Sequence, residues 1–172
     1  MVKKAKPINF NDIEKKYAKV NSYETYVVDV ETNSVIKYNP LFDKKKIQAL
    51  KVELFEKLKY SKEQEINFLE NDFEFYNYIY FLTIKYFTHF KDMIADDFET
   101  QIIQMEKLVS TGLFELILID VLPEDEMQKV FDAVLDAIEL AERAVAIEEQ
   151  FKLDMKKKTS NPVVRERLGI NG

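Results

Sequence analysis

The chain has 172 residues, a net charge of −6 and 47% hydrophobic residues, which predicts one folded domain with a sizeable core and excludes a wholly disordered protein. The absence of cysteine excludes disulfides, thiol catalysis and thiolate metal sites. Only three glycines and four prolines are present, which favours long helices over a turn-rich β fold. The first ten residues have no apolar run behind their charges, so we expect no signal peptide and an intracellular protein.

The charge is unevenly distributed. Residues 1–19 contain six lysines against Asp12 and Glu14, a net +4. Residues 124–154 contain ten acids against three bases, a net −7, and residues 156–172 contain five bases against one acid, a net +4. Basic ends could bind nucleic acid, but an acidic body opposes the approach of phosphate. We therefore interpret the ends as solvated tails and expect no nucleic-acid partner.

Residues 1–40 are predicted to form a basic tail followed by a small β unit. The tail is predicted over residues 1–7 and the β region from Tyr17 to Tyr38. Residues 23–30 are rich in β-branched and aromatic side chains, residues 31–34 supply turn chemistry, and residues 35–38 resume the β pattern. This indicates a hairpin or a three-stranded meander. Such a unit is marginal alone, so we expect it to pack on a helix or on a neighbouring subunit.

Residues 41–158 are predicted to form a helical domain. Asp43 is placed to cap a helix that runs to about Tyr60, with apolar residues at helical spacing. Ser61 and Gln64 have the spacing of a second capping box, which predicts the start of a separate short helix. The predicted fold class is thus mainly α, a helical bundle with a small N-terminal β-hairpin or meander.

An aromatic run between residues 71 and 93 is the most distinctive stretch of the chain. Nine of the eighteen residues from Phe73 to Phe90 are Phe or Tyr. The longest uncharged run within it has ten residues, whereas a membrane span needs about 20, so we predict a buried core helix and no membrane partner. Asn71 is a favourable cap, with Glu74 three residues later.

The remaining segments are also expected to be helical. A helix from Phe98 should end or bend at Gly112. The apolar run 113–122 could be a strand or a helix, and the shortage of other strands favours a helix. Pro123 and three acids then open a long C-terminal helix that reaches Lys156–Lys158, and residues 159–172 form a flexible tail.

One short motif suggests an enzyme. The sequence VVDVET at residues 27–32 resembles the first motif of DnaQ-like 3′–5′ exonucleases, where an Asp and a Glu two residues apart hold a metal ion. The last motif of that family sets a His five residues before an Asp, but the residue five beyond His89 is Ile94. An ordinary half-exposed strand explains Asp29 and Glu31 better. We expect no catalytic residues, no metal and no cofactor.

The order of features along the chain resembles a different family. A basic start (KPINFNDIEKKY), a short β unit, an acidic helical body and the stretch LVSTGLFELILIDVLPEDE are similar to tail assembly chaperones of long-tailed phages of Gram-positive bacteria. The resemblance spans residues 7–154. It implies a non-enzymatic, acidic chaperone that binds the largely helical tape measure protein and keeps it soluble for tail assembly.

The resemblance also implies partners and a location. The tape measure protein is the expected client, with the tail tube protein and a frameshifted longer form of the chain as further partners, and self-association is open. The protein would act in the host cytoplasm and be absent from the mature virion. An interaction protein of another kind, such as an inhibitor of a host defence enzyme, is the alternative.

A chaperone must present apolar surface to its client while surrounding acid keeps it soluble. The predicted client-binding residues lie on the far half of the long helix and among the aromatic residues of the central run. They are Tyr78, Phe90, Ile138, Val145 and Phe151.

Overall fold

The computed structural model describes residues 7–158. The protein is mainly helical, with a long C-terminal helix and an N-terminal β-hairpin, which confirms the predicted fold class. The chain divides into two compact units, Met1–Phe131 and Asp132–Gly172. The tail predicted for residues 159–172 lies outside the described part of the chain.

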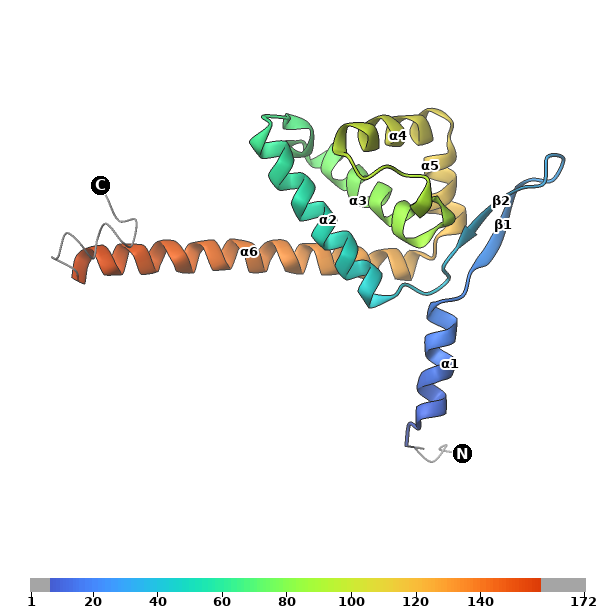
Figure 1. Cartoon of the computed structure of the whole chain (residues 1–172), viewed down its shortest axis with the longest axis horizontal. Helices are drawn as coiled ribbons and strands as arrows, with labels where there is room; N and C mark the ends of the chain where they lie inside the picture. The colour runs from blue at the N-terminus through green and yellow to red at the C-terminus, as the bar shows by residue number, and fades with distance from the viewer. Residues whose placement is uncertain (1–6, 159–172) are drawn as a thin grey trace. The chain divides into compact units, whose positions relative to one another are not determined.

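The first element, α1 (Phe10–Val20; Figure 1), shows that the prediction of a β region from Tyr17 is wrong, since residues 17–20 are helical. The basic tail predicted for residues 1–7 lies, except for Pro7, outside the described part of the chain. Asn9 and Asp12 form a capping box, because the Asn9 side chain accepts from Asp12 N at 3.0 Å and the Asp12 carboxylate accepts from Asn9 N at 3.2 Å. None of the residues of α1 is buried.

The β unit is a two-stranded antiparallel hairpin of β1 (Glu24–Asp29) and β2 (Ser34–Tyr38). Ile36 of β2 is buried. Asn39 N, just after β2, donates to Phe87 O at 2.8 Å. The hairpin therefore packs on the end of a helix, as a marginal β unit requires.

Helix α2 (Lys44–Glu63) begins at the predicted cap, where the Asp43 carboxylate accepts from Lys45 N at 2.9 Å. The predicted helix start at Ser61 is wrong. Ser61 is buried in the last turn of α2, and its hydroxyl donates to Ile66 O. Because this hydroxyl is needed to close the bend after α2, it cannot cap a new helix, and Gln64 ends α2 instead. A 3₁₀ turn, Asn67–Glu70, follows.

Helix α3 (Asp72–Phe87) is the centre of the first unit, between α2 and α5 in Figure 1. Asn71 caps it, since its side-chain oxygen accepts from Phe73 N at 2.9 Å. Nine of its residues, Tyr78, Ile79 and Phe81–Phe87, are buried. The prediction of a buried core helix is confirmed.

The last helices follow in quick succession. Helix α4 (Phe98–Ser110) ends before Gly112, whose φ of +72° is left-handed. Helix α5 (Leu113–Leu116) continues into a π-helical turn, Ile117–Val121, so the apolar run is helical, as favoured. Helix α6 (Glu124–Lys158) has 35 residues. Among residues 7–158, no helix is both long enough and apolar enough to cross a membrane.

Candidate interaction surfaces

The first unit contains an apolar groove, which we call the acid-rimmed groove. It consists of two adjoining hollows of about 590 and 510 Å³ that share Tyr80, Leu118 and Ile119. Its apolar lining comes from the 3₁₀ turn before α3, from α3, from α4, from α5 with the π-helical turn that continues it to Leu122, and from the start of α6. These residues are Phe68, Phe73, Tyr80, Met105, Val109, Phe114, Leu118, Ile119, Leu122, Met127 and Phe131.

The groove combines a fixed floor with an exposed edge. Met105 and Phe114 are buried, whereas Phe73 is 69% and Ile119 is 77% exposed. The Phe131 ring lies 4.6 Å from the Tyr80 ring, which fastens the start of α6 to α3. Exposed side chains of this size on a packed floor are typical of a helix-binding groove.

The charges that line the groove are all negative. Glu74 and Glu106 border one hollow together with Glu115, and Glu124 borders the other. Neither lining includes a lysine or an arginine. An apolar face flanked by positive charge would therefore be attracted to this surface and a negative one repelled.

The second unit has its own apolar surface, on α6. Ala137, Leu140, Ala144, Ile147 and Phe151 follow one another at alternating spacings of three and four residues. Leu140 is 69% and Ile147 is 70% exposed. This is the spacing that brings one helix against another along a continuous seam. We call these five residues the α6 stripe.

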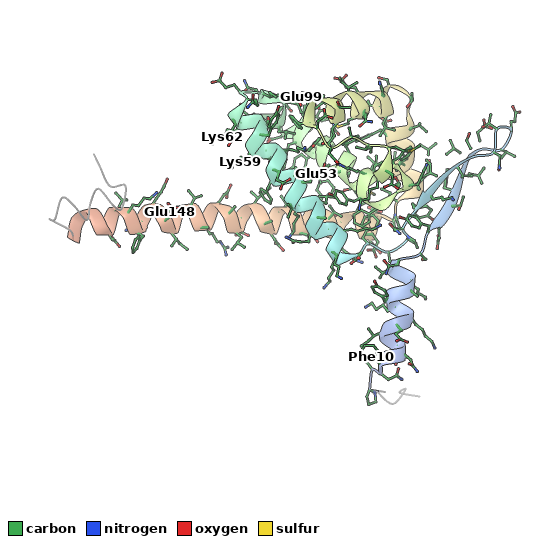
Figure 2. The ribbon with its side chains drawn as sticks, viewed as in Figure 1. Phe10, Glu53, Lys59, Lys62, Glu99 and Glu148 are labelled. Atoms are coloured by element: carbon green, nitrogen blue, oxygen red, sulfur yellow. The ribbon has the colours of Figure 1, made fainter. Side chains whose placement is uncertain are left out.

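Acidic side chains accompany the α6 stripe. Glu139 pairs with Arg143 at 2.5 Å and Glu148 with Lys152 at 2.6 Å, each one turn apart on α6 (Figure 2 labels Glu148). Exposed pairs of this kind contribute little stability. They do keep the flanks of an apolar helix charged and hydrated.

The predicted client-binding residues have different environments. Val145 and Phe151 are each 57% exposed on α6, and Ile138 and Phe90 are half-buried. Tyr78 is fully buried, because it faces the core between α3 and α4, where its ring meets Phe98 edge-on. Tyr78 is therefore wrong as a surface residue. For the other four, client binding stays a prediction.

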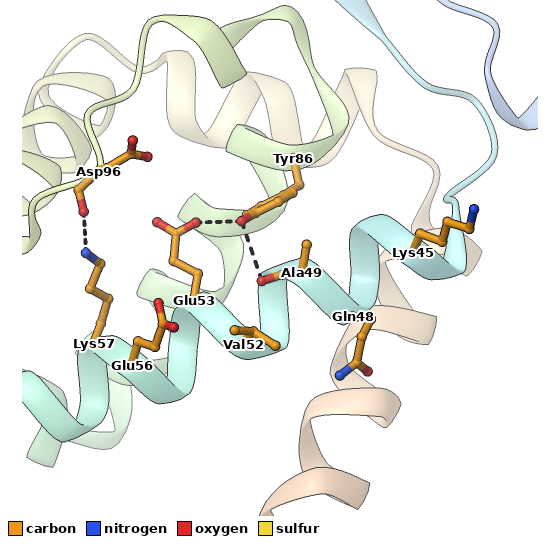
Figure 3. A pocket seen from close by; sticks show the side chains of 9 residues that line it. All are labelled: Lys45, Gln48, Ala49, Val52, Glu53, Glu56, Lys57, Tyr86 and Asp96. Carbon is orange, nitrogen blue, oxygen red and sulfur yellow. Dashed lines mark hydrogen bonds between the residues drawn. The ribbon is translucent and has the colours of Figure 1, made fainter.

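A third hollow, of about 520 Å³, lies beside α2 and contains several ionisable side chains (Figure 3). Its lining includes Glu53, Tyr86 and Asp96. Glu53 accepts from Lys85 Nζ at 2.8 Å, from Gln101 Nε2 at 2.6 Å and from Tyr86 Oη at 2.7 Å. Lys85 also donates to Asp96 at 3.0 Å. These hydrogen bonds connect α2, α3 and α4. The three side chains that donate to Glu53 are therefore already engaged within the protein and serve its structure.

The titration of this cluster follows from its packing. Burial alone would raise the pKa of Glu53, but hydrogen bonds from Lys85, Gln101 and Tyr86 outweigh it, so the pKa lies below its usual range. Burial, followed by the hydrogen bond to Glu53, raises the pKa of Tyr86. The centre of the cluster at neutral pH is thus an ionised Glu53 carboxylate that accepts hydrogen bonds from the side chains of Lys85, Gln101 and Tyr86.

The residues of the exonuclease-like motif serve the hairpin turn. The Asp29 carboxylate accepts from Glu31 N at 2.8 Å and from the Thr32 hydroxyl at 2.7 Å, which lowers the pKa of Asp29. His89 Nδ1 accepts from Lys37 N at 3.2 Å and so joins β2 to the end of α3. Across residues 7–158, no group of three or more His, Cys, Asp or Glu side chains is arranged to hold a metal ion.

Together these features define a class: a mainly helical protein with exposed apolar surfaces bordered by acidic residues. The chain belongs to the YomO family, whose model matches residues 10–166. No curated protein and no solved structure matches the chain.

Proposed function

We propose that the protein is a non-enzymatic phage tail assembly chaperone that binds a helical client, the tape measure protein. The observation that supports this most directly is the α6 stripe, in which Leu140, Ile147 and Phe151 stay exposed at the spacing of a helix–helix seam. A helical client laid along α6 would cover these side chains and keep its own apolar side from aggregating.

The size of the stripe fits a client helix. From Ala137 to Phe151, at 1.5 Å per residue, the stripe is about 21 Å long. Ala137 and Ala144 are small, which allows a client backbone to approach closely between the larger side chains. The acids of residues 124–154, with a net charge of −7 in that segment, would keep the complex in solution.

Co-expression with fragments of the tape measure protein tests the proposal. The wild-type chain should increase the soluble fraction of a fragment, and the double variant Leu140→Ser/Ile147→Ser should lose most of that effect. Both positions are exposed, so the variant should keep the helical circular dichroism of the wild type.

The matched control is Glu139→Ser/Arg143→Ser, which changes the same helix without removing apolar surface. This control variant should keep the fragment soluble to the same extent as the wild type does. The proposal fails if the wild-type chain leaves the fragment insoluble, or if both double variants rescue it equally.

A further inference from the structure

Helix α1 is amphipathic, and its apolar side is uncovered. Phe10, Ile13 and Tyr17 recur at spacings of three and four residues, so they share one side of the helix. Phe10 is 73% exposed at the first turn (Figure 2), and Ile13 and Tyr17 are also exposed. Lysines 15, 16 and 19 occupy much of the remaining surface.

A helix of this length needs support from outside itself. Isolated helices shorter than about 12–15 residues are marginal in water, and α1 has 11 residues, none of them buried. Its capping box stabilises only the first turn. Covering Phe10, Ile13 and Tyr17 would supply the missing stabilisation.

The acid-rimmed groove is complementary to the apolar, basic surface of α1. Its floor is apolar and lined by aromatic rings, and its charged lining consists of glutamates. α1 itself has three lysines against Asp12 and Glu14, a net charge of +1, and residues 1–19 together have a net charge of +4. The two surfaces are therefore complementary in both polarity and charge, and α1, about 16 Å long, is of a size to lie along two adjoining hollows.

We propose that α1 of one copy of the chain binds in the acid-rimmed groove of a second copy, and that two copies exchange their α1 helices reciprocally to form a dimer. Only residues 21–23 connect α1 to β1, and Ser22 O accepts from Asn39 Nδ2 at 2.8 Å. This bond fixes the end of α1 beside the hairpin base, which favours a groove on another copy over the one in the same chain.

An anionic membrane surface would also attract a basic amphipathic helix. The net charge of α1 itself is only +1, because Asp12 and Glu14 offset two of its three lysines. Helices that bind at a membrane surface are rich in lysine and arginine on their polar face, so we assign α1 to the groove. This proposal does not depend on the identity of a client, so it can fail while the proposed function stands.

Because the chain has no cysteine, cross-linking between introduced thiols tests the contact directly. An affinity-tagged Ile13→Cys chain is mixed with an untagged Ile119→Cys chain and treated with a short bismaleimide. The expected product is a cross-linked pair of one tagged and one untagged chain. The Ile13→Cys chain mixed with Val52→Cys, an exposed position on α2 outside the groove, should give at least about tenfold less product.

The double variant Ile13→Cys/Ile119→Cys separates the alternatives. If it forms only an internal link while the mixed single variants form none, α1 binds its own chain and the proposal is overturned. Equal cross-linking to both positions, or no cross-linking at all, also overturns it. The proposal is also overturned if vesicles of equal parts phosphatidylglycerol and phosphatidylcholine bind α1 and abolish the cross-link.

Sedimentation provides a second measurement on the full chain. The wild type should sediment as a dimer, and Ile13→Ser/Tyr17→Ser should raise the dimer dissociation constant at least about tenfold. Lys15→Ala, on the side of α1 opposite the apolar residues, should change it far less. A wild type that stays monomeric at high concentration, or an Ile13→Ser/Tyr17→Ser variant that dimerises normally, would contradict the exchange.

Discussion

Replacing Glu53 with alanine should destabilise the first unit more than any other single carboxylate substitution on α2. The Glu53 side chain is 12% exposed and accepts hydrogen bonds from Lys85, Gln101 and Tyr86. Its removal leaves the ammonium of Lys85, whose side chain is only 4% exposed, without its most buried counter-charge.

The expected loss in the free energy of unfolding depends on which hydrogen bonds the partners of Glu53 retain. Removing one partner of a buried ion pair typically costs about 3–5 kcal/mol. Lys85 would keep Asp96 and Ala95 O, and Gln101 would keep Ala95 O, so we expect the lower end, about 3 kcal/mol. Only Tyr86 would be left with a long contact, at 3.5 Å from Ala49 O.

Urea unfolding followed by circular dichroism measures this change in the free energy of unfolding. The matched control is Glu56→Ala, one turn of α2 away in the lining of the same hollow, which should change stability by less than about 0.5 kcal/mol. Equal losses in Glu53→Ala and Glu56→Ala would refute the assignment of Glu53 as the centre of the buried cluster.

The same carboxylate predicts a pH dependence. The pKa of Glu53 is lower in the folded protein than its ordinary value of 4.5, so its contribution is complete above that value and is lost as the pH falls through the folded pKa. The stability difference between wild type and Glu53→Gln should therefore stay constant from neutral pH to about pH 5 and shrink below about pH 4.5. A difference that shrinks as the pH rises above 5 would contradict the sign.

Three further outcomes are expected. Asn71→Ala should cost about 1 kcal/mol in urea unfolding, because the cap of α3 is lost, while an exposed substitution at Glu70 should not. Gly112→Ala should cost about 1–2 kcal/mol through its left-handed backbone alone, since no atom lies within 4 Å of the added methyl group, and Gly112→Asn should cost less. Thermal unfolding of Leu140→Ser should match the wild type within about 0.5 kcal/mol, since this side chain is exposed.

The sequence predicted the elements whose signals are local. Asn71 with the aromatic run, Asp43 with its apolar spacing, and Gly112 each mark an observed boundary. These predictions succeed because a cap or a left-handed turn depends on residues within one helical turn.

Two predictions of local structure were wrong, and in the first of them a tertiary contact overrides the local sequence pattern. Ser61 and Gln64 match a capping box, but α2 runs through Ser61, whose buried hydroxyl closes the bend at Ile66. The helix α1 was missed although Asn9 and Asp12 cap it reciprocally, because the capping acid is Asp rather than the usual Glu or Gln. That signal was available in the sequence.

The interior polar cluster could not be predicted from spacing. Lys85 of α3 is buried, and it donates hydrogen bonds to Glu53, 32 residues away in sequence, and to Asp96, 11 residues away. The acid-rimmed groove has the same origin, since its lining is assembled from five separate helical segments. Contacts of this separation depend on the tertiary fold.

The charge distribution determines how copies of this chain can meet. If two acid-rimmed grooves faced each other, their glutamates would repel, and the same holds for two acidic stretches of α6. The basic residues 1–19 are different, because their apolar side chains on α1 come with positive charge. A contact between unlike surfaces usually leads to open chains, but a reciprocal exchange of α1 closes after two copies and uses both grooves. The same negative charge that opposes nonspecific aggregation would then direct self-association through one helix.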